Sequence, residues 1–158
     1  MPKKSTKLPG HLKRRVVLTG GPAAGKTAVC EVLRRHLANE VAVLPEVATL
    51  LFQAGFPRPK DQAGRRLVQQ TIYSVQRNLE GIFEITHPDL THICDRGTLD
   101  GGAYWPGGLE RFLGAMGTTL EGEYRRYDAV IFLQTSAYGE GAYETESSAR
   151  IETPAQAR

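Results

Sequence analysis

The 158-residue chain is poor in the residues that build disulfide frameworks and metal centres. It has two cysteines and four histidines, and none stands at a spacing typical of metal ligands. Cys30 and Cys94 each lie in an apolar pattern, so we expect buried, reduced thiols. No apolar run reaches membrane-spanning length, and the basic start is not followed by the apolar segment of a signal peptide. These absences predict a cytoplasmic protein without a membrane span.

Acidic residues are absent from the first fifteen positions, which hold six of the 20 basic residues. The rest of the chain has 14 basic and 17 acidic residues, so the pI near 9.0 reflects the N-terminal end alone. Residues 1–13 are therefore predicted to form a disordered basic tail, either solubilising or able to touch an anionic surface. With the charge confined to this tail, we expect no specific nucleic-acid binding. Residues 14–158 are long enough for one domain with a proper core.

The segment 16–30 carries the motif G-x-x-x-x-G-K-[ST] between a short apolar run at 15–19 and a helical apolar pattern at 28–37. Backbone N–H groups of such a loop can point into one concavity at the positive end of the following helix. The lysine can reach the β- and γ-phosphates of a nucleotide, and the threonine hydroxyl can bind Mg²⁺. The predicted nucleotide-binding residues are Gly20, Gly21, Pro22, Ala23, Ala24, Gly25, Lys26 and Thr27.

Strands and helices alternate along the rest of the chain. The patterns predict strands at 41–46, 91–95 and 128–135, a short helix at 47–56, a long helix at 65–84, and short helices from 109 and from a capping box at Thr118 and Glu121. The long helix has an apolar stripe at Val68, Ile72, Val75, Leu79 and Ile82. The segment 97–108 is interpreted as a Gly-rich loop, in which Tyr104 and Trp105 could stack on a ring or else only pack. Strands that are apolar on both faces predict an α/β fold, a three-layer parallel sheet covered on two sides.

Ligands of such sheets bind beyond the carboxyl ends of the strands, where Glu46, Asp95 and Arg96 lie. Asp95 ends an apolar strand and is a candidate Mg²⁺ ligand, or else a turn former. Arg96 is a candidate phosphate contact, or else a surface charge. Glu46 follows Pro45 in an apolar run, so a partly desolvated carboxylate could act as a base. The alternative for Glu46 is a helix N-terminal carboxylate.

Four segments together resemble a known family: VVLTGGPAAGKT, LPEVATLLFQAGFP, ICDRGTLDGGAY and ARIETPAQAR. They are similar to P-loop AAA-type ATP-binding domains that include the ribosylnicotinamide kinase domain of NadR and the TRPL translocation defect proteins. The resemblance implies a nucleoside- or nucleotide-kinase-like fold, with the strand of Asp95 beside the phosphate-loop strand. It implies that Glu46 faces an acceptor hydroxyl, that Asp95 and Arg96 handle Mg²⁺ and phosphate, and that a mobile lid contains Arg150.

Relatives of this kind continue beyond the lid, whereas the helix-start signature that runs from Thr153 to Gln156 ends two residues before the chain stops. We therefore expect the domain at 14–158 to be incomplete after the lid start. For Arg150 the alternative role is a solvated charge at a helix end.

Two functions are compatible with these features. The first is a small-molecule kinase that transfers the γ-phosphoryl group of Mg²⁺-bound ATP to a hydroxyl of a nucleoside-like acceptor, with Glu46, Arg96 and Arg150 as catalytic residues. The alternative is a binding module that engages a protein partner only when ATP or GTP is bound. Glu46 favours the kinase, because a switch needs no base at an acceptor site.

Overall fold

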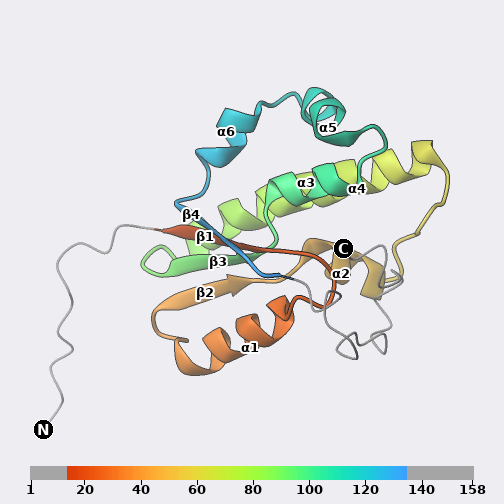
Figure 1. Ribbon diagram of the computed structural model, residues 1–158. Coiled ribbons are helices and arrows are strands. Elements are labelled where there is room, and N and C mark those ends of the chain that lie inside the picture. Colours follow the sequence, from red (N-terminus) through yellow and green to blue (C-terminus); the bar gives the residue numbers. More distant parts are fainter. Residues whose placement is uncertain (1–13, 135–158) are drawn as a thin grey trace, which may run out of the picture.

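The computed structural model describes residues 14–134, which form a parallel sheet with helices on both faces (Figure 1). The predicted tail, Arg150 and the helix start at Thr153 lie outside the described residues. The strands are β1 (Arg15–Thr19), β2 (Val41–Leu44), β3 (Thr91–Asp95) and β4 (Ala129–Phe132). The helices are α1 (Lys26–His36), α2 (Val47–Gln53), α3 (Gln62–Thr86), α4 (Gly101–Tyr104), α5 (Gly108–Met116) and α6 (Leu120–Tyr124), with a short 3₁₀ helix η1 (Thr98–Asp100) before α4.

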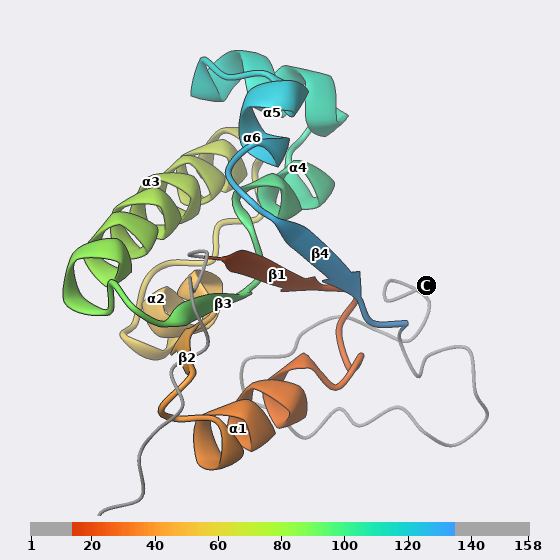
Figure 2. The same ribbon diagram turned by 90° about the vertical axis from the view of Figure 1, so that its left-hand side faces the viewer.

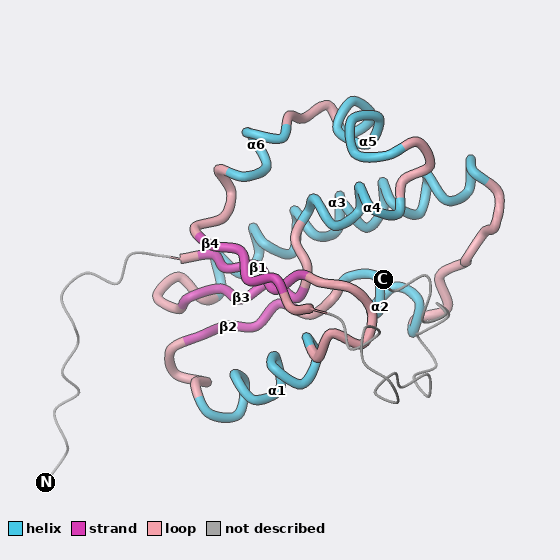
Figure 3. The backbone as a smooth tube through the Cα atoms, in the orientation of Figure 1, coloured by secondary structure: helices cyan, strands magenta, loops and turns pink. Residues whose placement is uncertain are grey.

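The sheet has the strand order β2-β3-β1-β4, and all neighbouring strands are parallel. This arrangement, visible in Figure 3, confirms the predicted α/β P-loop NTPase fold. β3 pairs directly with β1, and Leu18 stands opposite Asp95 in the register. The strand that ends in Asp95 therefore lies beside the strand that leads into the phosphate loop, as the resemblance implies.

Helices α1 and α3 cover opposite faces of the sheet, as the turned view in Figure 2 shows. On one face, Cys30 of α1 packs against Leu18 and the strands beside it. On the other face, Leu79 and Phe83 of α3 pack against a cluster that contains Cys94. Both cysteines are free and buried, as predicted, and burial raises the pKa of Cys30 to about 11 and that of Cys94 to about 12. Both therefore remain unreactive thiols at neutral pH.

The apolar stripe predicted for α3 is only partly correct. Val68 is buried, but Ile82 is 53% exposed, whereas the polar side chains of Gln76 and Glu80 are buried. Glu80 tolerates this position because its carboxylate oxygens accept hydrogen bonds from arginine, tyrosine and glutamine side chains. A pattern of apolar residues cannot reveal a buried helix face that contains a charged residue whose hydrogen bonds are all made within the protein.

The Gly-rich segment after β3 is helical and not a loop, since it forms η1 and α4. Its glycines serve close packing: a Cβ at Gly101 would lie 3.1 Å from the Phe112 ring, and one at Gly102 would lie 2.6 Å from Leu109 Cδ1. The predicted capping box is also displaced by one residue. Thr119, not Thr118, caps α6 by accepting a hydrogen bond from Gly122 N–H at 3.1 Å.

β4 departs from the expectation that every strand is covered on both faces. It lies at the edge of the described sheet, and its four residues are exposed, with Phe132 70% exposed. Within residues 14–134, no helix combines the length and the apolarity that crossing a membrane requires.

Candidate functional site

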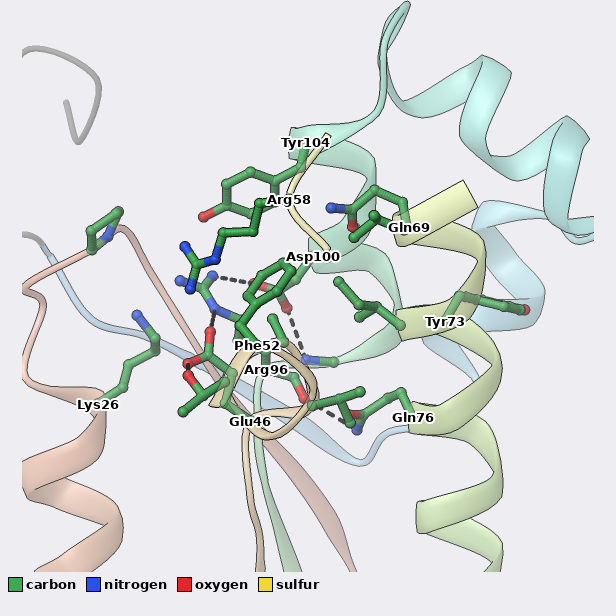
Figure 4. Close-up of a pocket in the computed structure, with 18 of the residues that line it drawn as sticks. Lys26, Glu46, Phe52, Arg58, Gln69, Tyr73, Gln76, Arg96, Asp100 and Tyr104 are labelled. Carbon is green, nitrogen blue, oxygen red and sulfur yellow. Dashed lines mark hydrogen bonds and ion pairs between the residues drawn. The ribbon is translucent and has the colours of Figure 1, made fainter. Parts of the chain in front are cut away.

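A cavity of about 1150 Å³ opens where β1, β2 and β3 end. One half is lined by the phosphate loop and the start of α1, and the other half by α2, α3 and α4 (Figure 4). Glu46 and Arg96 lie between the two halves. The segments after β1, β2 and β3 therefore form one site, at the carboxyl ends of the strands, where parallel sheets bind their ligands.

The phosphate loop has backbone conformations that its glycines explain. Gly20 has φ 139°, and a Cβ there would lie 2.1 Å from the carbonyl oxygen of Leu133, just after β4. Gly25 has φ 80° and precedes the first residue of α1. Ala23 also adopts a left-handed φ of 61°. The loop is thus bent tightly between β1 and the N-terminus of α1, where backbone N–H groups favour an anion.

The side chain of Lys26 is buried and does not project into open solvent. It is 7% exposed, and its Nζ donates to the carbonyl oxygens of Gly20 at 2.9 Å and Gly21 at 2.8 Å. Burial lowers the pKa of the Lys26 ammonium, and the positive charge of Arg96 lowers it further. The side chain is folded back across the loop, because these two carbonyls accept hydrogen bonds from its ammonium group. A phosphate can compete for the same donor.

Asp95 is 6% exposed, and its Oδ1 is buried without a hydrogen-bond partner. Burial raises the pKa of the Asp95 carboxyl, and the Glu46 carboxylate raises it further. Thr27 lines the cavity in the first turn of α1. Among residues 14–134 there is no group of three histidine, cysteine or carboxylate side chains that could hold a metal. Mg²⁺ in nucleotide sites needs few protein ligands, so an unpartnered Asp95 oxygen together with Thr27 fits this ion.

Glu46 is the N-cap residue of α2, but its side chain does not cap the helix backbone. Oε1 accepts from Arg96 Nε at 2.5 Å, and Oε2 accepts from the Thr49 hydroxyl at 2.7 Å. Burial alone would raise the pKa of the Glu46 carboxyl, but the Arg96 charge and these hydrogen bonds outweigh it and lower the pKa. The sequence predicted a desolvated, more basic carboxylate. The structure instead has a carboxylate that is ionised and bound by a cation.

Arg96 has a left-handed φ of 71° and points its guanidinium into the cavity. Besides Glu46, it contacts Asp100, whose Oδ1 accepts from Arg96 Nη1 at 3.1 Å and from the Thr19 hydroxyl at 2.6 Å. Sequence reasoning missed Asp100. Its spacing of four from Arg96 is a helical contact distance, but the segment was interpreted as a loop.

The half of the cavity beyond Glu46 is aromatic and apolar on its walls, with some polar groups. Figure 4 shows Phe52, Tyr104 and Gln69 around this space. The Arg58 guanidinium lies 4.0 Å from the centroid of the Phe52 ring, and Arg65 Nη2 donates to the Tyr104 carbonyl at 3.3 Å. Of these residues the sequence singled out Tyr104 alone, as a side chain able to stack on a ring. Trp105, its neighbour, is buried and packs on Phe112 instead.

A second group of charges lies behind the site, and we call it the buried cluster. It consists of Glu80, Glu123, Arg15, Arg126 and Tyr127. Both carboxylates are fully buried. The cluster holds the segment after β3 in place, because Glu123 Oε2 accepts from the Thr98 hydroxyl at 2.5 Å and the Tyr127 phenol oxygen accepts from the Thr98 N–H at 2.9 Å. The position of Arg96 thus depends on side chains from α3, α6 and the loop before β4.

Comparison with known proteins gives one result that covers almost the whole chain. A family model described as AAA domain matches residues 15–158. No curated protein matches the chain. The matched range begins at β1 and includes every residue that lines the cavity. The chain therefore belongs to the AAA domain family, and it is a nucleotide-binding P-loop protein.

Proposed function

We propose that the chain is a kinase that transfers the γ-phosphoryl group of ATP to a hydroxyl of a nucleoside-like small molecule. One observation carries this proposal: the cavity that contains the phosphate loop continues past Glu46 into a second, aromatic-walled half. That half is lined by Phe52, Ile72 and Tyr104, with the amide of Gln69 available to a polar ring edge. A protein that only bound and released a nucleotide would not need this extra space.

The donor would bind at residues 20–27, with Lys26 exchanging its loop carbonyls for phosphate oxygens. Thr27 and Asp95 would hold Mg²⁺, which when bound would neutralise charge on the phosphate oxygens. We also propose ATP as donor, with GTP as the alternative, and a cytoplasmic location, which the two free thiols support.

In the transfer, a bond would form between the acceptor oxygen and the γ-phosphorus while the bond from that phosphorus to the β–γ bridging oxygen breaks. ADP leaves, and the hydroxyl proton passes to the Glu46 carboxylate. For this step Arg96 must release Glu46, and its guanidinium then becomes available to the transferred phosphoryl group. Arg150, outside the described residues, is the proposed lid arginine, in keeping with the proposed likeness to the NadR kinase domain.

The rival function, a nucleotide-dependent module for a protein partner, is favoured by the state of Glu46. Its lowered pKa and its contacts with Arg96 and Thr49 are those of a structural ion pair. The two functions differ in what they consume. A kinase uses ATP in proportion to an added small molecule, and a switch does not.

The test is a screen of purified full-length chain with ATP or GTP, Mg²⁺ and a panel of nucleosides and nucleotides with free hydroxyls. ADP formation and the mass of the acceptor are measured together. We expect ADP and one phosphorylated acceptor in equal amounts, with little ADP when the acceptor is omitted. Nucleotide hydrolysis that no acceptor stimulates, with no phosphorylated product, would reject the kinase in favour of the switch.

A further inference from the structure

If the chain is the proposed kinase, the charged residues that line its cavity indicate the chemical class of the acceptor. Among the described residues, the cavity is lined by the cations Lys26, Arg58, Lys60, Arg65 and Arg96 and by the carboxylates Glu46 and Asp100. Arg96 binds both carboxylates, and Lys26 belongs to the phosphate loop. The three remaining cations, Arg58, Lys60 and Arg65, line the cavity from the segment between α2 and α3 and from the beginning of α3, and we call them the far cations.

Two of the far cations are held against the aromatic walls. Arg58 stacks on Phe52 at 4.0 Å, and Arg65 donates to the backbone of Tyr104 at 3.3 Å. Figure 4 draws Arg58 and Tyr104 among the residues that line this cavity. Such contacts reduce the side-chain entropy that an arginine loses when it binds an anion. The cations are thus positioned beside the space that a ring would occupy.

Two of the far cations also lie at an unfavourable end of a helix. Lys60 precedes α3, and Arg65 is in its beginning, where the helix dipole is positive and a further positive charge is destabilising. The acid of this segment is Asp61, whose Oδ1 accepts from Gly64 N–H at 2.7 Å and caps the helix. One carboxylate does not balance Lys60, Arg65 and the helix dipole together. An anion bound in the cavity would gain from all of these charges at once.

We propose that the acceptor carries a phosphate or carboxylate group remote from its reacting hydroxyl, and that Arg58 and Arg65 bind this group, with Lys60 adding to the field. The substrate class is then an anionic nucleoside-like molecule and not a neutral nucleoside. The hydroxyl faces Glu46 at the boundary of the two halves, the ring lies between Phe52 and Tyr104, and the anion lies at the start of α3.

The experiment measures binding and needs no turnover. The full-length chain is saturated with a non-hydrolysable ATP analogue and Mg²⁺, so that the phosphate loop is occupied, and is titrated calorimetrically with matched ligands. Uridine is compared with uridine 3′-monophosphate and with orotidine, which adds a ring carboxylate, and adenosine is compared with adenosine 3′-monophosphate. Each ligand keeps a free 5′-hydroxyl, and the pairs separate phosphate from carboxylate and one base from another.

We expect at least one anionic member to bind about tenfold or more tightly than its neutral partner, and this preference to shrink as salt is added. Arg58→Gln and Arg65→Gln should each remove most of the preference and leave the affinity for the neutral member unchanged. The matched control is Arg66→Gln, because Arg66 is the next residue of α3 but lines a different, smaller cavity with Trp105 and Arg111. The control should keep the preference.

Three results would overturn the proposal. Equal affinity within every pair, including no binding of either member, removes the anion site. If Arg65→Gln and Arg66→Gln lose the preference for the anionic ligand equally, the preference reflects the net positive charge of this region and not a specific site. If Arg58→Gln and Arg65→Gln weaken the ATP analogue and not the acceptors, the far cations serve the donor. A failure of the kinase itself is separate, since it is the absence of a phosphorylated product in the screen and not the absence of a binding preference.

Discussion

Two clusters of charged residues in this molecule contain the same residue types but have different roles. The cavity cluster comprises four residues that line the cavity, Lys26, Glu46, Arg96 and Asp100, together with Asp95 at the end of β3. The buried cluster comprises Glu80, Glu123, Arg15, Arg126 and Tyr127. In the buried cluster every carboxylate oxygen has a donor, whereas Arg15 Nε and Arg126 Nε have no acceptor among the described residues. Glu80 Oε1 accepts from Gln76 at 2.9 Å and Tyr127 at 2.7 Å, and Oε2 accepts from Arg15 and Arg126.

The cavity cluster is incomplete by the same measure. Within residues 14–134, Asp95 Oδ1 is buried without a donor. Arg96, Glu46 and Asp100, which form ion pairs with one another, all line the cavity, so a ligand bound there can contact them. A buried carboxylate whose oxygens all have donors stabilises one arrangement. A carboxylate oxygen without a donor, at the end of the strand that borders the phosphate-loop strand, is available to a ligand. We therefore expect the buried cluster to hold the fold and the cavity cluster to bind the substrates.

The largest effect on stability should follow from Glu80→Gln. The change leaves Arg15 and Arg126 without their shared carboxylate, and breaking a buried ion pair costs about 3–5 kcal/mol. Urea unfolding of the full-length chain measures the difference. The matched control is Glu84→Gln, since Glu84 also binds Arg15 but is 55% exposed, and its loss should cost about 1 kcal/mol or less. Equal losses of unfolding free energy in Glu80→Gln and Glu84→Gln would show that burial of the ion pair makes no difference to its contribution.

Lys26→Ala should have the largest effect on nucleotide affinity and a small effect on the fold. Removing a charge-assisted donor to phosphate should weaken Mg²⁺-ATP by about 100-fold. Calorimetric titration measures this, with Arg34→Ala as control, because Arg34 is an exposed cation on the same helix. Unchanged affinity in Lys26→Ala would exclude the phosphate-loop assignment.

Asp95→Asn should act on stability in the opposite direction to Glu80→Gln. Because the folded-state pKa of Asp95 is raised, the folded chain holds this proton more tightly than the unfolded chain does. The ionised group therefore destabilises the empty fold at neutral pH, and this cost disappears as the pH falls through the raised pKa. We expect the variant to melt a few degrees higher than the parent near pH 7, with a smaller difference in acid, and to lose Mg²⁺-dependent turnover. A variant that melts lower at neutral pH would show that the Asp95 carboxylate stabilises the empty fold instead.

The sequence was sufficient for the elements with strong local signals. The phosphate loop is bounded by an apolar strand and a helix, and β3 ends at an acid, so the fold and the end of β3 could be predicted. The segment after β3 was misinterpreted because its glycines look like a loop. They are there because Phe112 and Leu109 leave no room for a Cβ, a packing constraint between segments that no local pattern records.

Side-chain partners were less predictable than backbone elements. The ion pair of Glu46 with Arg96 joins residues 50 positions apart, and Asp100 enters only through the helical turn of η1. The buried Glu80 was missed because its partners come from β1 and from the segment after α6. Each of these contacts depends on tertiary packing that brings distant segments together.

Glu46→Gln tests most directly whether Glu46 serves an acceptor next to a bound nucleotide. Two quantities are measured on parent and variant: Mg²⁺-ATP affinity by calorimetry, and the rate of phosphoryl transfer to the acceptor that the screen identifies. We predict nearly unchanged affinity and a transfer rate lower by about 10²–10⁴-fold. Transfer at the parent rate would contradict the proposed role of Glu46, and so would a loss of ATP affinity as large as the loss in rate.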